Sequence, residues 1–160
     1  MHRQPTRAPH VGMIIALGAI LLAGVSPASA RSGAPISAYR VDGDGWQMFT
    51  ITNDTRERFD RRQLTLDREM SLAALRHSRA MARRGELFHT SDVDVYLDGV
   101  GWQTWGENVG YTSGDLSGLQ QAFMASPPHR SNILKPDFRH AAVGAVRVDG
   151  VLWVTVFFYA

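Results

Sequence analysis

The chain contains no cysteine, and this absence excludes several classes of protein at once. A disulfide-held secreted domain, a zinc site with thiolate ligands, a cysteine nucleophile and a lipid-anchored N-terminal cysteine all require that residue. Internal repeats and low-complexity segments are missing too. With 160 residues, 44% apolar and 20% charged, the composition is that of one ordinary globular domain.

The chain also lacks an excess of positive or negative charge once its first ten residues are left out of the count. The formal net charge is +2, and both surplus charges, Arg3 and Arg7, lie in the first ten residues. From Arg31 onward, 14 arginines and one lysine face 15 acidic residues, so this part is neutral. Nucleic-acid binding requires a clustered basic surface on the working domain. We therefore expect no nucleic-acid partner.

No apolar run reaches the roughly 20 residues that a membrane-spanning helix requires. An uncharged, mostly apolar run of 15 residues, 11–25, follows the two N-terminal arginines, and Ala28-Ser29-Ala30 has the small-x-small pattern of a cleavage site. The pattern predicts an export signal over residues 1–30, cut after Ala30, with no membrane span in the mature chain. An N-terminal anchor or a buried helix is the alternative. We expect a protein that is secreted, extracellular or held in the cell envelope.

The rest of the chain divides into an arm and one domain. Residues 31–45 are small and polar and contain Gly and Pro, which predicts a flexible N-terminal arm, followed by a single domain over 46–160. Residues 95–111, rich in Gly and Trp, predict loops and short extended pieces. Apolar spacing and end signals predict four helices, over residues 46–59, 67–84, 115–125 and 129–134.

A hairpin ends the sequence. Val143–Val148 and Val151–Tyr159 flank Asp149-Gly150, a favoured two-residue turn. Both faces of the second strand are apolar, so we expect cover on both sides of the sheet. The predicted fold class is α/β (α+β), a three-layer α/β/α sandwich with a small antiparallel sheet between helices.

Four histidines follow the predicted signal. His77 lies on the apolar face of a predicted helix and is interpreted as a core residue, and His140 precedes a strand and is interpreted as exposed. His89 follows a helix end, and His129 follows two prolines at a helix start. Functional sites concentrate at such loops and element ends. His89 and His129 are therefore the candidate functional histidines.

Glu107 is a lone carboxylate among glycines and aromatic residues. Two imidazoles and one carboxylate make a workable zinc set with a fourth position open for water, which the metal could activate for hydrolysis. The gaps of 18 and 22 residues separating His89, Glu107 and His129 fix no geometry, and no H-E-x-x-H motif is present. A hydrogen-bond network in which Glu107 joins two imidazoles is the other interpretation.

Several segments, in order, resemble the CAP superfamily, the SCP-like extracellular proteins that include cysteine-rich secretory, antigen 5 and pathogenesis-related proteins. The resemblance is to the bacterial, cysteine-free type. It rests on N-D-T-R at 53–56, A-L-R-H-S-R-A-M-A at 74–82, L-F-H at 87–89, G-E-N-V at 106–109, F-M-A-S-P-P-H-R-S-N-I-L at 123–134, and Val143-Gly144 with the hairpin.

The resemblance implies a three-layer sandwich with a surface cavity that holds a divalent metal such as zinc in some members. By motif position His89, Glu107 and His129 would line that cavity and be its metal ligands, with Trp105 and Asn108 beside them. Where many eukaryotic members carry a second glutamate, Ala125 or Ser126 stands here. The ligand set would therefore have at most three members.

Three functions follow from the resemblance and the residues. The chain could be a monomeric binding module for a lipid or another small apolar ligand. It could be a metal-assisted hydrolase or peptidase that uses His89, Glu107 and His129. It could also be a structural or interaction protein of the envelope, with an extracellular protein as partner. No reaction is common to the resembling family, so the sequence commits to no catalytic residue and favours a non-enzyme.

Overall fold

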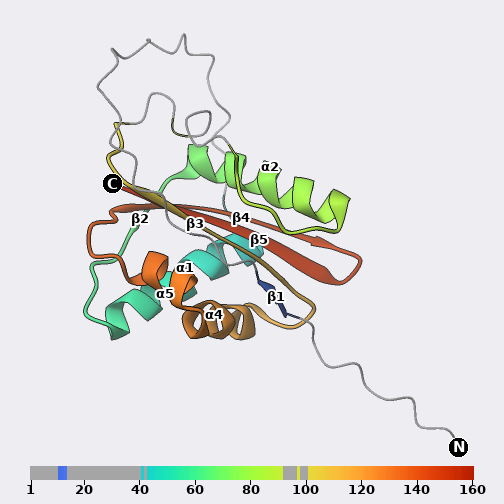
Figure 1. Ribbon diagram of the computed structural model, residues 1–160, viewed down its shortest axis with the longest axis horizontal. Helices are drawn as coiled ribbons and strands as arrows, with labels where there is room; N and C mark the ends of the chain where they lie inside the picture. The colour runs from blue at the N-terminus through green and yellow to red at the C-terminus, as the bar shows by residue number, and fades with distance from the viewer. Residues whose placement is uncertain (1–10, 14–40, 42, 92–96, 98–100) are drawn as a thin grey trace, which may run out of the picture.

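The computed structural model describes residues 11–13, 41, 43–91, 97 and 101–160. The described elements form three layers: helix α2 (Arg68–Arg84) covers one face of a mixed sheet, and three other helices cover the opposite face (Figure 1). The opposite layer holds α1 (Gly43–Arg58), α4 (Leu116–Ala125) and α5 (Pro127–Leu134). The predicted sandwich is confirmed.

The sheet has the strand order β1-β3-β5-β4-β2. Its strands are β1 (Val11–Met13), β2 (Thr65–Leu66), β3 (Trp105–Thr112), β4 (His140–Val148) and β5 (Val151–Tyr159). Only β2 and β4 pair in parallel; the other pairs are antiparallel. The last strand of the chain is thus the central strand of the sheet.

The predicted hairpin is confirmed. Asp149 and Gly150 have φ values of 49° and 77°, as a tight turn between twisted strands requires. Residues 152–159 of β5 are all buried. Leu152, Val154 and Phe158 pack among residues of the three-helix layer, and Phe157 packs with residues of α2. Cover on both faces explains the uninterrupted apolar run.

The ends of α2 follow from its flanking residues. The Asp67 carboxylate accepts a hydrogen bond from the amide of Met70 at 2.9 Å, which caps the first turn. Gly85, at φ 65°, closes the last turn in the left-handed conformation. Between these ends the helix lies directly on β4, because a Cβ on Gly144 would come within 2.1 Å of the Leu75 amide nitrogen.

Several element boundaries differ from the sequence prediction. Strand β4 begins at His140, which was expected to precede the strand and to be exposed but is half-buried within it. Strand β3 spans eight residues where loops and short pieces were expected. Its glycines are contact points: a Cβ on Gly106 would meet the Asn132 side chain at 2.6 Å, and one on Gly110 would meet Phe123 at 3.0 Å. Helix α1 begins at Gly43, inside the predicted arm, and α5 begins at Pro127.

The predicted signal and arm fall mostly outside the described residues. Val11–Met13 form the short strand β1 beside Gly110–Thr112 of β3. Val41 is buried, and Gly43–Gly45 belong to α1. Among the residues that the structure describes, no helix is long and apolar enough to span a membrane.

Candidate functional site

Glu107 lies in β3, and its side chain is only 1% exposed. Alternate residues of a strand point to opposite faces of the sheet, and Glu107 faces the α2 layer. Its Oε2 lies 2.7 Å from Nδ1 of His89 and accepts a hydrogen bond from the backbone amide of Thr90 at 3.0 Å. The segment after α2 therefore supplies two donors to one buried carboxylate.

His77 of α2 is the second imidazole at this carboxylate. Its Nδ1 lies 3.6 Å from Oε1 of Glu107, and its side chain is 3% exposed. Burial lowers the pKa of His77 below the usual value of 6.5; Glu107 raises it in part, whereas His89 and Arg84 lower it further. His77 is therefore neutral at pH 7.

Hydroxyl groups fix where the proton of His77 sits. Ser78 Oγ lies 2.9 Å from the carbonyl oxygen of Gly144 and 2.9 Å from Thr155 Oγ1. A carbonyl only accepts, so Ser78 donates its single proton to Gly144, and Thr155 donates to Ser78. Thr155 then accepts from His77 Nδ1 at 3.1 Å. His77 thus carries its proton on Nδ1 and a lone pair on Nε2.

His89 has the same arrangement. Its Nδ1 faces the Glu107 carboxylate, which accepts, so the proton of a neutral His89 lies on that nitrogen. The Nε2 atoms of His77 and His89 are buried, and neither forms a hydrogen bond with a residue that the structure describes. We define the Glu107 cluster as Glu107, His77 and His89. It is one carboxylate between two imidazoles.

His129 does not join this cluster. It lies on α5, in the layer on the other face of the sheet (Figure 1). Its Nδ1 is 2.8 Å from Ser126 Oγ, and its ring stacks on Phe123 with centroids 5.1 Å apart. The side chain of Asn108, which follows Glu107 and faces the opposite way, donates to the carbonyl of His129 at 3.1 Å.

The expected ligand set of His89, Glu107 and His129 is therefore not assembled. Two members meet, and the third lies across the sheet because residues 107 and 108 point to opposite faces. Among the described residues, no group of three or more His, Cys, Asp or Glu side chains is placed to hold a metal ion. The donor set does not fit a zinc centre, so we derive no metal-dependent step.

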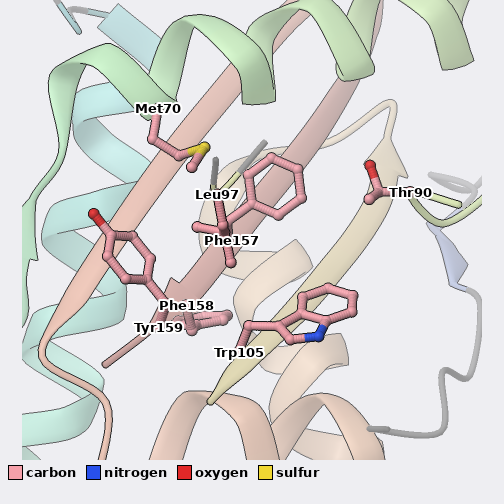
Figure 2. Close-up of a pocket in the computed structure, with 7 residues that line it drawn as sticks. All are labelled: Met70, Thr90, Leu97, Trp105, Phe157, Phe158 and Tyr159. Atoms are coloured by element: carbon pink, nitrogen blue, oxygen red, sulfur yellow. The ribbon is translucent and has the colours of Figure 1, made fainter. Parts of the chain in front are cut away.

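Figure 2 shows the residues that line a small, mostly apolar pocket. The cavity has a volume of about 10 Å³, close to what a single water needs. It is lined by Met70 of α2, Trp105 of β3, Phe157, Phe158 and Tyr159 of β5, and Thr90 and Leu97. Thr90 joins the pocket to the cluster, since its amide donates to Glu107.

The residues that were expected to line one cavity thus lie in separate places. Of the five predicted cavity residues, Trp105 lines the pocket, and Glu107 and His89 lie in the adjoining cluster. Asn108 and His129 lie on the other side of the sheet. His77, Thr90 and Thr155 were missed. The adjacent polar residues His77 and Ser78 within the buried face of α2 were the available signal, because buried polar groups need partners.

Comparison with known proteins shows the family. The model of the CAP, or cysteine-rich secretory protein, family matches residues 49–158. The chain belongs to the CAP family. The matched range begins in α1 and ends in β5, so it includes the whole Glu107 cluster. This CAP domain has no cysteine, although the family is named for that residue.

One sequence relative of this CAP domain is the uncharacterized protein YkwD of Bacillus subtilis. It is 29% identical over 128 residues, which cover 76% of this chain and 48% of YkwD. An extracellular SCP-domain protein of Bacillus anthracis aligns with a TM-score of 0.64 and 26% identity over 81% of this chain and 45% of that one. The chain therefore spans about half the length of these relatives.

Two more distant structures share the fold. A cysteine-rich secretory protein of Staphylococcus aureus aligns with a TM-score of 0.62 and 23% identity, over 72% of this chain and 38% of that chain. An outer surface protein of Borrelia burgdorferi aligns with a TM-score of 0.63 and 14% identity, over 72% of this chain and 91% of that chain. At these identities the similarity establishes the architecture only.

Proposed function

We propose that this CAP domain is an exported binding module without catalytic turnover, which takes an apolar group of a small ligand into the pocket beside the Glu107 cluster. One observation carries the proposal: Thr90 Oγ1 is a buried hydroxyl that forms no hydrogen bond with any described residue, and Thr90 lines an otherwise apolar pocket. Few polar groups in an apolar pocket are typical of small-molecule sites. The expected ligand has a short apolar tail next to a hydrogen-bonding group.

An extracellular setting is part of the proposal. It is supported by the predicted signal of residues 1–30 and by the relative from Bacillus anthracis, which is described as extracellular. The S. aureus neighbour is described as secretory.

A hydrolase is less well supported by the same geometry. A general base must reach the proton it removes, directly or through one water. Glu107 is buried and already accepts from the Thr90 amide while facing two imidazoles. The arrangement supports a carboxylate that holds the post-α2 segment against β3, as in the network interpretation.

The test is a titration with methanol, a probe close in size to the single water that the pocket can hold, followed through the 13C-labelled methyl group of Met70, which lines the pocket. We expect saturable shifts of that methyl signal. Leu97→Phe should fill the pocket and weaken binding at least tenfold. Thr90→Val keeps the shape of the side chain and removes the hydroxyl, so it should weaken methanol binding and leave the binding of methane unchanged.

Thr50→Val is the matched control, because Thr50 is exposed on α1 and its hydroxyl donates to the carbonyl of Trp46. It should bind as the parent does. Equal shifts in the parent and in Leu97→Phe would place the alcohol elsewhere and contradict the proposal. A loss of binding in both threonine variants would indicate a general loss of structure.

A further inference from the structure

The outer surface of α2 carries a row of arginines. Arg68, Arg76, Arg79 and Arg83 are all exposed. We call these four residues the α2 arginine row. Of the helices labelled in Figure 1, α2 lies on one face of the sheet and the other three lie on the opposite face, so none of those three covers the row.

Helix geometry aligns these side chains. At 3.6 residues per turn the four positions fall within an arc of about 80°, opposite the buried face of the helix. At 1.5 Å per residue the row extends for about 22 Å along the axis. The row is therefore a line of positive charge rather than a single point.

The row has few local partners. Within the part of the chain that the structure describes, no acidic side chain forms an ion pair with any of the four arginines. The described acidic residues of the α2 region, Asp67, Glu69 and Glu86, lie near the two ends of the helix. Net neutrality after Arg31 thus coexists with a local concentration of positive charge on one layer.

We propose that the α2 arginine row binds a linear, phosphate-bearing anionic polymer outside the cell. The planar fork of guanidinium matches phosphate oxygens in pairs, so arginine suits phosphate recognition. A row of about 22 Å is longer than one phosphate group can bridge, and it matches a chain of repeated charges. The proposal depends on the predicted export and is independent of the pocket.

A membrane surface fits the row less well. Stable insertion requires large apolar side chains beside the basic ones. The exposed large apolar residues of the described chain are Trp46, Phe59 and Val148, and none belongs to α2. Long double-stranded DNA is the other class of phosphate polymer that could use such a row.

The test measures the affinity of the protein for long-chain inorganic polyphosphate at several salt concentrations. The variant Arg76→Gln/Arg79→Gln/Arg83→Gln removes three charges with a residue that also favours helix. We expect at least tenfold weaker binding at low salt. The slope of log K against log[salt] should fall in magnitude by about 2, since each lost phosphate contact contributes roughly 0.7–0.9.

A control variant with the same charge change is Arg58→Gln/Arg62→Gln/Arg147→Gln, whose three arginines are exposed outside α2. It should retain at least a third of the parent affinity and the parent slope. Equal losses in both triple variants would show that net charge alone matters and would overturn the proposal.

Two further probes separate the other partners. Tighter binding of a DNA duplex than of polyphosphate, lost in the α2 variant, would replace the proposal with a nucleic-acid surface. Binding to phosphatidylglycerol vesicles without binding to polyphosphate would replace it with a membrane surface. Polyphosphate binding that is strongest and depends on α2 would support the proposal.

Discussion

A carboxylate that is 1% exposed must be balanced by the groups around it. In Glu107 this balance comes from the amide of Thr90 and the Nδ1 proton of His89, with His77 a little farther away. Removing one donor would leave a buried charge with too few partners. The single residue Glu107 therefore joins α2, β3 and the segment between them.

His77 makes stability depend on pH. Its pKa is lowered in the folded protein, so the unfolded chain binds the proton more readily. The contribution of neutral His77 to the free energy of unfolding should be fully present above about pH 6.5. Below that pH the free energy of unfolding should decline, by up to about 1.4 kcal/mol per pH unit. His77→Asn places an amide donor near the position of Nδ1 and should flatten this decline. Urea unfolding at pH 5.0, 6.0 and 7.5 measures it.

The matched control is His140→Asn, which changes the histidine stacked on Tyr159 instead. If the decline persists in His77→Asn and disappears in His140→Asn, the pH dependence comes from His140, and the prediction for His77 is wrong. A decline of equal size in all three proteins would assign it to other groups.

The sequence alone predicted part of the site. Glu107 and His89 were found because a lone carboxylate and a histidine after a helix end stand out in the sequence. The pairing with His129 failed because strand β3 was not predicted, and without a strand nothing says that residues 107 and 108 face opposite ways. His77 was assigned to the core, where it does lie, although it also contacts the carboxylate.

Helix α2 and strand β4 meet at Gly144, where backbone touches backbone. Gly144→Ala would place a Cβ 2.1 Å from the Leu75 amide nitrogen and 2.2 Å from the Ala74 carbonyl carbon. Neither atom can yield as a flexible side chain can, so the helix must move. We expect a loss of about 3 kcal/mol or more in the free energy of unfolding, at the upper end of overpacking effects.

Gly101→Ala provides the control, because Gly101 is exposed and a Cβ there meets nothing within 4 Å. Its unfolding free energy should change by less than about 0.5 kcal/mol. Thermal unfolding followed by circular dichroism compares the two variants. Similar stabilities for Gly144→Ala and Gly101→Ala would contradict the close packing of α2 on β4.

The elements differ in how far sequence patterns predict them. Helix α2 has an N-cap, a C-cap and a regular apolar face, and it was predicted to within one residue. Strand β3 was not predicted, because Gly106 and Gly110 suggested a loop. These glycines are instead places where side chains of α5 and α4 approach the strand, a requirement set by tertiary packing that local patterns do not contain.

At the scale of the whole molecule, β1 adds a three-residue edge to the sheet beside β3. If residues 1–30 are removed, Gly110–Thr112 become part of an open edge, while β3, β4 and β5 keep all their mutual pairs. We expect the shortened protein to unfold cooperatively. Its amides at residues 110–112 should exchange faster with solvent than those of the full chain, as amide hydrogen exchange can measure.

Unchanged exchange at residues 110–112 would contradict the pairing of β1 with β3. The paired residues Asn108 and Val156 supply the internal reference, because the β3–β5 ladder at that point does not involve β1. Their protection should be the same in both proteins.

The central place of β5 has a consequence for the newly made chain. The ribosome delivers residues 151–159 after every other element of the domain, and both β3 and β4 need β5 as their neighbour. Until these residues emerge, the helices have no complete sheet to cover, and long-range strand pairing is slow even then. A growing chain of this topology therefore cannot complete its sheet, or bury the helix faces that pack on β5, until its last strand has been made.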